Sequence, residues 1–240
     1  MISKNEIKYI QSLFHKKTRD AEAVFIAEGV KLVNELLESS IHIKKIYATK
    51  EWIAKHNNLK NLAEIEDYEL QKISSLSTPN QVLVIADQKK LLLQPELQTN
   101  ITLALDGIQD PGNLGTIIRI ADWFGITQIV ASEDTVDVYN SKVVQSTMGS
   151  IIRVNVWYKN LNEWLSNCNV PVYGAMLNGT SIHDYEIINE GVLVIGGESK
   201  GIRESVQPFI RYSVTIPKKG GAESLNASVA TGIILSHFTR

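Results

Sequence analysis

The chain has 240 residues, of which 44% are apolar and 21% charged, enough for one large α/β domain or two smaller ones with hydrophobic cores. Its 24 Lys and Arg residues against 26 Asp and Glu residues give a formal net charge of −2, which argues against a histone-like electrostatic binder. An RNA enzyme is still allowed, because RNA binding requires only a local patch of cations that neutralises phosphates.

The single cysteine, Cys168, cannot form an intramolecular disulfide and has no neighbour at metal-ligand spacing. We therefore expect neither a disulfide scaffold nor a metal site. The N-terminus is polar and rich in lysine, and no apolar run approaches the roughly 20 residues of a membrane span. These features predict a cytoplasmic protein that does not bind a membrane.

Positive charge is concentrated at the N-terminal end. Residues 1–60 contain 11 Lys and Arg against 7 Asp and Glu, whereas residues 100–240 contain 10 against 13. Apolar residues recur with helical spacing at Ile7, Ile10, Leu13 and Phe14. The cations Lys8, Lys16, Lys17 and Arg19 fall largely on or just beyond the polar side of that helix, and they are interpreted either as an RNA-docking surface or as a solvated helix face.

The chain divides into two predicted domains. A helix over 28–38 and strands over 43–48 and 81–86 predict a small α/β domain at residues 1–87. Residues 88–100, which include Pro95, predict a linker. Residues 101–240 then form a second domain.

In the second domain strands and helices alternate, and the strands are near-continuous apolar runs. This pattern predicts an α/β fold with a mostly parallel sheet covered by helices on both faces. The predicted strands are 101–106, 128–131, 152–156, 172–175, 192–195 and 212–216. The predicted helices are 113–124, 141–148, 161–166, a short one from 201, and 225–238.

The common nucleotide-binding and hydrolase fingerprints are missing. The sequence has no G-x-G-x-x-G after a strand, no G-x-x-x-x-G-K-[ST] and no G-x-S-x-G. A standard dinucleotide-binding dehydrogenase, a P-loop enzyme and an α/β hydrolase are therefore disfavoured. Instead, three polar, glycine-rich segments follow predicted strands, at 106–119, 195–202 and 216–232.

Each segment has a structural and a functional interpretation. Asn113 suits a helix N-cap, and Arg119 lies about 1.7 helical turns further on, so the two side chains point in different directions. Glu198 is either a surface carboxylate or the partner of a cation such as Arg119. Ser224 or Asn226 suits the N-cap of the last helix. Three such loops at one sheet edge are harder to explain by capping alone.

The three segments contain N-L-G-x-x-x-R, G-G-E-x-x-G-I and I-P-x-x-G-x-x-x-S-L-N-A-S-V-A-x-G. In order and spacing they resemble the three motifs of the SpoU (TrmH) family of SPOUT-class RNA ribose 2′-O-methyltransferases. The stretch F-x-A-E-G at residues 25–29 is similar to the substrate-binding domain that precedes the catalytic domain in many members that modify rRNA.

The resemblance implies a C-terminal trefoil knot that binds S-adenosylmethionine, with S-adenosylhomocysteine as product. It also implies a homodimer, in which one protomer offers Arg119 to a ligand held by the other. Gly196, Ile216 and Leu225 would line the cofactor pocket, with Leu177 a less secure addition. The polar site residues that match the family are Asn113, Arg119, Glu198, Ser224 and Asn226.

The chemistry requires alignment of the methyl donor with the ribose oxygen and stabilisation of charge on that oxygen. Because a guanidinium has a pKa above ~12 and is a poor base, we assign Arg119 to orienting the adjacent phosphate and stabilising the developing alkoxide. Asn113 and Glu198 would hold Arg119 and its loop, whereas Ser224 and Asn226 would shape the pocket. A separate N-terminal domain favours rRNA as substrate. The alternatives are a tRNA methyltransferase and a non-catalytic RNA-binding or assembly factor.

Overall fold

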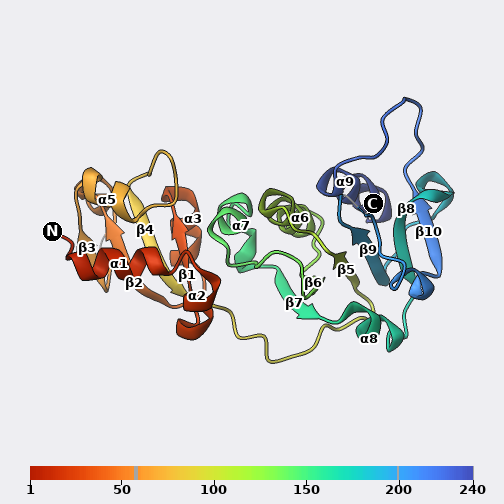
Figure 1. The fold of residues 1–240 in the computed structure, drawn as a ribbon, viewed down its shortest axis with the longest axis horizontal. Coiled ribbons are helices and arrows are strands. Elements are labelled where there is room, and N and C mark those ends of the chain that lie inside the picture. Colours follow the sequence, from red (N-terminus) through yellow and green to blue (C-terminus); the bar gives the residue numbers. More distant parts are fainter. Residues whose placement is uncertain (57–58, 199, 240) are drawn as a thin grey trace. The chain divides into compact units, whose positions relative to one another are not determined.

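The computed structural model describes residues 1–56, 59–198 and 200–239. The chain forms two compact units, each of which is described by itself (Figure 1). Unit 1 consists of residues 1–90 and 137–152, and unit 2 of residues 91–136 and 153–240.

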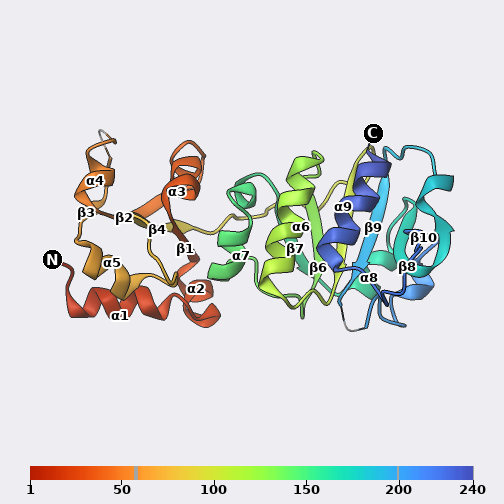
Figure 2. The ribbon, with the colours of Figure 1, turned by 90° about the horizontal axis from the view of Figure 1, so that it is seen from above.

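Unit 1 is built on a sheet with the strand order β1-β4-β2-β3. Strand β4 is antiparallel to β1 and β2, and β3 is parallel to β2. Figure 2 shows α1, α2 and α5 on one face of this sheet and α3 and α4 on the other. The elements are α1 (Lys4–Ser12), α2 (Lys16–Glu22), β1 (Val24–Glu28), α3 (Val30–Leu37), β2 (Ile43–Ala48), α4 (Lys50–Ile53), β3 (Leu62–Glu64), α5 (Asp67–Ile73) and β4 (Val82–Asp87).

The strands predicted over 43–48 and 81–86 are confirmed within one residue. The helix predicted over 28–38 begins later, because Glu28 is the last residue of β1. Gly29 makes the turn between strand and helix with φ +90°, a conformation that favours glycine. Strand β1 was not predicted, because its short apolar run passes directly into the residues predicted as a helix from Glu28.

A segment between β6 and β7 of the second unit belongs to unit 1. It comprises α7 (Ser141–Ser146) and the 3₁₀ helix η1 (Ser150–Ile152), and α7 packs against β1. The rings of Phe25 and Tyr139 lie 5.0 Å apart, and the backbone N–H of Lys89 donates to the Tyr139 hydroxyl at 2.8 Å. The Lys89 ammonium donates to the carbonyls of Ile151 at 3.2 Å and Ile152 at 3.1 Å.

The strand predicted over 152–156 is therefore partly wrong. Ile151 is buried within unit 1, and β7 begins only at Asn155. The first part of the apolar run, in η1, therefore packs in unit 1, and the chain enters the sheet of unit 2 only afterwards. A local pattern cannot distinguish these two uses of apolar residues.

Unit 2 contains a sheet with the order β10-β8-β9-β5-β6-β7, in which every pair of neighbours is parallel. Helices α6 and α9 pack together over one face and α8 lies on the other (Figure 1). The elements are β5 (Ile101–Asp106), α6 (Pro111–Trp123), β6 (Gln128–Ser132), β7 (Asn155–Lys159), α8 (Leu161–Ser166), β8 (Val172–Ser181), η2 (Ile182–Asp184), β9 (Gly191–Gly196), η3 (Gln207–Phe209), β10 (Tyr212–Thr215) and α9 (Ala227–Phe238).

The predicted α/β class with a parallel sheet and helices on both faces is confirmed. The short helix predicted from residue 201 is wrong, since Gly201 lies in a turn with φ +61° and the next helical element is η3. The helix predicted over 141–148 ends at Ser146. Within the described ranges, every helix is too short or too polar to cross a lipid bilayer.

Candidate active site

The three predicted loops lie at one edge of the unit 2 sheet. They follow β5, β9 and β10, and because all strands of this sheet are parallel, the carboxyl ends of these strands share one edge. Parallel α/β sheets bind ligands at this edge. The fold therefore places the three motif segments where a site is expected.

Side chains from the three segments form one hydrogen-bonded group. The Asn113 amide donates to Oε1 of Glu198. The Asn226 amide donates to Oδ1 of Asn113 at 2.9 Å and to Oε1 of Glu198 at 2.9 Å. A carboxylate that accepts from both amides fixes their orientation and joins the three loops. We refer to Asn113, Glu198 and Asn226 as the amide–carboxylate cluster.

The prediction that Asn113 caps its helix is wrong. Helix α6 starts at Pro111, and Asp110 is the N-cap, with Oδ1 accepting from the Asn113 N–H at 2.8 Å. Proline suits the first helical position because its missing N–H needs no partner there. Because Asp110 caps the helix, the Asn113 side chain, which is 9% exposed, is available to the cluster.

Asn226 is the N-cap of α9, so one of its two predicted roles is confirmed. Its Oδ1 accepts from the backbone N–H of Ser228 at 2.9 Å and of Val229 at 3.3 Å, and α9 begins at Ala227. The amide nitrogen remains free to reach the cluster. Asn226 thus performs the structural and the site-building role together.

The turn that carries Glu198 leaves no room for side chains at its glycines. A Cβ atom on Gly196 would lie 2.1 Å from the carbonyl carbon of Gly201, and one on Gly197 would lie 2.6 Å from the carbonyl oxygen of Gly107. The loops after β5 and β9 therefore touch through their backbones.

A charged pair that the sequence did not predict, Asp106 and Arg203, links the end of β5 to the residues after the turn that carries Glu198. The fully buried Asp106 accepts from Nε of Arg203 at 2.6 Å and from its backbone N–H at 2.8 Å. Nη1 of Arg203 also donates to Asp134 at 3.3 Å. A carboxylate at the end of a buried strand predicts that a cation will pair with it, but the sequence does not indicate which residue supplies that cation.

The charges in this pair stabilise each other. Hydrogen bonding to Asp106 raises the pKa of Arg203. Hydrogen bonding from Ser132, together with the charge of Arg203, holds the pKa of Asp134 below its ordinary value. These shifts favour the charged forms of Arg203 and Asp134 at neutral pH.

Arg119 stands apart from the amide–carboxylate cluster. It is exposed on α6, and its guanidinium makes no hydrogen bond or ion pair with another residue in the described ranges of the chain. Glu198 bonds to Asn113 and Asn226 instead of to Arg119. The predicted contact between Glu198 and Arg119 is therefore not formed within one chain.

The other predicted site residues lie on the same strands and loops. Ile216 is half-buried beyond β10, whereas Ser224 and Leu225 are exposed in the loop before α9. Leu177 is 69% exposed, and its carbonyl accepts from the Thr215 hydroxyl at 3.0 Å. The exposed apolar side chains of Leu177 and Leu225 suit contact with the flat ring of a ligand.

Comparison with protein families identifies the chain. Residues 100–236 match the model of the SpoU rRNA Methylase family, and residues 4–84 match the MRM3-like substrate binding domain. The chain belongs to the SpoU rRNA methylase family. The resemblance drawn from the three motifs is thereby confirmed.

Related proteins match over nearly the whole chain. The chain is 30% identical over 248 residues to the 23S rRNA (guanosine(2553)-2′-O)-methyltransferase RlmP of Bacillus subtilis, covering 98% of this chain and 97% of the relative. A solved TrmH-family structure from Porphyromonas gingivalis has a TM-score of 0.88 at 36% identity, covering 99% of this chain and 98% of the other. The AdoMet-bound rRNA methyltransferase of Sinorhizobium meliloti has a TM-score of 0.85 at 30% identity, covering 99% and 95%.

Proposed function

We propose that the protein transfers a methyl group from S-adenosylmethionine to a ribose 2′-hydroxyl of 23S rRNA. The observation that carries this proposal is the amide–carboxylate cluster, which joins all three family motifs through Asn113, Glu198 and Asn226. Full-length similarity to a 23S rRNA 2′-O-methyltransferase supports the substrate class.

The loops at the carboxyl edge fit the cofactor. Gly196 and Ile216 lie at the carboxyl ends of β9 and β10, and Leu225, in the loop before α9, is 48% exposed. We assign these three residues to cofactor binding, with Leu177 beside them. When bound, S-adenosylmethionine supplies an activated methyl group. No group of three or more His, Cys, Asp or Glu side chains suited to a metal ion occurs in the described ranges.

We assign the chain's polar residues to separate tasks. The amide–carboxylate cluster holds the loops after β5, β9 and β10 in register. The free guanidinium of Arg119 orients a phosphate of the RNA and stabilises negative charge on the 2′-oxygen as its proton leaves. Ser224 lies in the same exposed loop as Leu225 and shapes the RNA side of the pocket.

We also propose a homodimer formed through α6 and α9. Trp123 of α6 is 84% exposed and Val229 of α9 is 49% exposed, on two helices that pack together. A second copy could cover these two apolar side chains, and it would bring Arg119 of α6 to a neighbouring site. This arrangement explains why Arg119 makes no contact with Glu198 of its own chain.

The domain assignment follows from these roles. Residues 1–87 would bind RNA, residues 88–100 would link, and residues 101–240 would form the methyltransferase domain with a C-terminal trefoil knot. We place the protein in the cytoplasm, where rRNA is available to it.

Transfer of labelled methyl groups tests the proposal. Purified protein with labelled S-adenosylmethionine is expected to label 23S rRNA from a strain that lacks this gene, and mapping would locate the label on a ribose. Label in tRNA alone would favour the tRNA alternative. Cofactor-independent RNA binding without any transfer would favour the assembly-factor alternative.

A further inference from the structure

A cavity of about 320 Å³ opens at the carboxyl edge of the unit 2 sheet. It is lined by residues 132–134 after β6, by residues 159–162 after β7, and by Arg203 and Ser205. None of these residues was assigned a role by the three motifs. The cavity shares its sheet edge with the amide–carboxylate cluster, because β5, β6, β7 and β9 are parallel.

One side chain separates the cavity from the loops of the proposed active site. Arg203 lines the cavity and binds Asp106 at the end of β5, with Nε 2.6 Å from Oδ1. The Asp106 carbonyl in turn accepts from the N–H of Gly197 at 2.9 Å, directly before Glu198. A group bound in the cavity would therefore contact Arg203, which is linked through Asp106 to the turn that carries Glu198.

The lining mixes hydrogen-bond donors and acceptors. The Arg203 side chain is 40% exposed although it binds Asp106. The Lys159 ammonium has three N–H donors and uses one of them to donate to Oε1 of Gln94 at 2.5 Å. The acidic residues Glu133 and Asp134 also line the cavity. Such carboxylates repel a phosphate, whereas a nucleobase presents donors and acceptors side by side and matches both kinds of group.

The size and floor of the cavity also suit a base. A volume of about 320 Å³ lies at the lower end of small-ligand sites, which begin at roughly 300 Å³. Leu161 and Asn162 of α8 also line the cavity, and the half-buried Asn162 amide can both donate and accept hydrogen bonds.

We infer that this cavity binds a base of the RNA substrate, close to the nucleotide whose ribose is methylated. The inference rests on the proposed function and extends it, because it assigns base recognition to Lys159, Asn162 and Arg203 at the carboxyl edge. The base would be drawn out of its stack to reach the cavity, as is usual for single-stranded segments read by proteins.

Filling the cavity tests the inference. Ser205 is exposed on the cavity rim, so Ser205→Trp should block the space without disturbing the core. We expect kcat/KM for 23S rRNA to fall at least tenfold, with the Kd for S-adenosylmethionine and the unfolding midpoint unchanged. Asn162→Trp, which fills the cavity from α8, should have the same effect.

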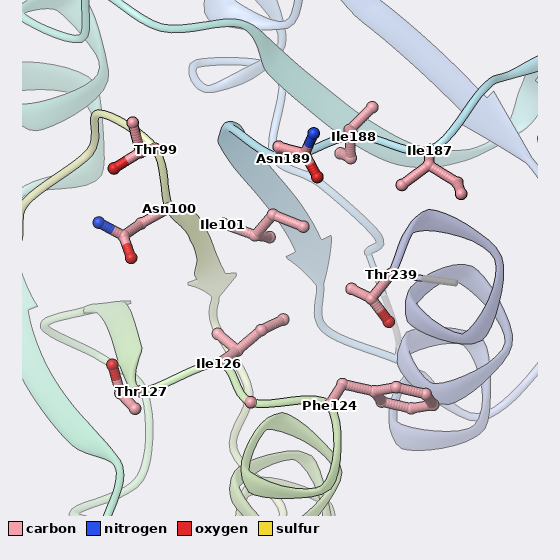
Figure 3. Close-up of a pocket in the computed structure, with 11 residues that line it drawn as sticks. Thr99, Asn100, Ile101, Phe124, Ile126, Thr127, Ile187, Ile188, Asn189 and Thr239 are labelled. Atoms are coloured by element: carbon pink, nitrogen blue, oxygen red, sulfur yellow. The ribbon is translucent and has the colours of Figure 1, made fainter.

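A second cavity of unit 2 supplies the matched control. It has a volume of about 230 Å³ and lies at the opposite, amino-terminal edge of the sheet, where Asn189 and Thr127 are among the residues that line it (Figure 3). Asn189→Trp fills this cavity with the same side chain. We expect that variant to methylate RNA at the wild-type rate, because its cavity is on the wrong edge for the substrate.

Photo-cross-linking gives a direct readout. A benzophenone amino acid at position 205 should cross-link to 23S rRNA, and the same group at position 189 should not. Wild-type kcat/KM for both Ser205→Trp and Asn162→Trp, or no RNA adduct at position 205, would overturn the cavity assignment without contradicting the proposed function. No methyl transfer to RNA by the wild-type protein would instead overturn both.

Discussion

Arg19 and Asp137 form a buried ion pair although 118 residues separate them in sequence. Nη2 of Arg19 lies 2.5 Å from Oδ2 of Asp137, and the two side chains are 3% and 12% exposed. Arg19 also donates through Nη1 to the carbonyls of Leu13 and Phe14, each at 2.9 Å. The pair holds the 137–152 segment to the rest of unit 1, which consists of residues 1–90 and 137–152.

Removing one partner of this pair should weaken unit 1. Arg19→Ala leaves the Asp137 carboxylate buried without a cation, and we expect the free energy of unfolding to fall by about 3–5 kcal/mol. Urea denaturation measures the loss. The exposed pair between Lys16 and Asp20, 3.4 Å apart, provides the control, since Lys16→Ala should cost less than about 1 kcal/mol. Equal losses for both variants would contradict this account.

The members of the amide–carboxylate cluster should act together. Asn113→Ala and Glu198→Gln each disturb the contact between Asn113 and Glu198, so the double variant should lose less cofactor affinity than the sum of the two single variants. We expect a coupling free energy of about 0.5–3 kcal/mol, measured from the Kd for S-adenosylmethionine in all four proteins. Strict additivity would show that the hydrogen bond does not organise the site.

Arg119 should serve turnover and not stability. Because it is exposed and makes no ion pair within the described ranges, Arg119→Ala should leave the unfolding midpoint and the Kd for S-adenosylmethionine unchanged. We expect kcat to fall by about 10²–10³, as when one donor to a developing oxyanion is lost. The control is Arg211→Ala, another exposed arginine, whose guanidinium lies 5.4 Å from the Tyr212 ring centroid. Wild-type turnover by Arg119→Ala would refute the role.

Trp123 should determine the oligomeric state. Placing a charge on the exposed α6 surface by Trp123→Glu should shift the protein from dimer to monomer and reduce methyl transfer, because Arg119 would no longer reach a second site. Analytical ultracentrifugation measures the shift. Tyr68→Glu, at a residue of unit 1 that is 50% exposed, should leave the mass unchanged. A wild-type protein that is monomeric at assay concentration would contradict the dimer.

Lys89 should make unit 1 more stable as the pH rises above neutrality. Burial lowers the pKa of its ammonium to about 8, against 10.5 in the unfolded chain, so between these values the unfolded state binds more protons than the folded state. The free energy of unfolding contributed by Lys89 therefore increases from about pH 8 to about pH 10. Chemical denaturation of the wild type and of Lys89→Met at each pH measures the difference between them. An equal pH dependence in both proteins would rule out Lys89 as its source.

Local signals were enough to predict much of the methyltransferase domain. Apolar runs predicted strands β5, β6 and β9 within one residue at each end, since strands buried on both faces leave a continuous pattern. Glycine-rich loops after strands marked the three motif segments, because close backbone approach requires residues without a Cβ atom. Asn226 was likewise one of two residues, with Ser224, predicted as a possible cap of the last helix, and it is the cap.

Pairings between distant residues were beyond such signals. The sequence suggested Asn113 as the cap of its helix, and only the fold showed that Asp110 is the cap and that the Asn113 side chain donates to Glu198. The Arg203 partner of Asp106 was not predicted, because 97 residues separate them.

The sequence by itself determined the α/β class, the parallel sheet and the three loops, since each depends on residues close together along the chain. Only the tertiary structure decided that residues 137–152 join unit 1 and that Asn113, Glu198 and Asn226 form one cluster. Both arrangements are stabilised by burial and by hydrogen bonds between segments that meet only after folding. Such contacts produce no periodic pattern in the sequence.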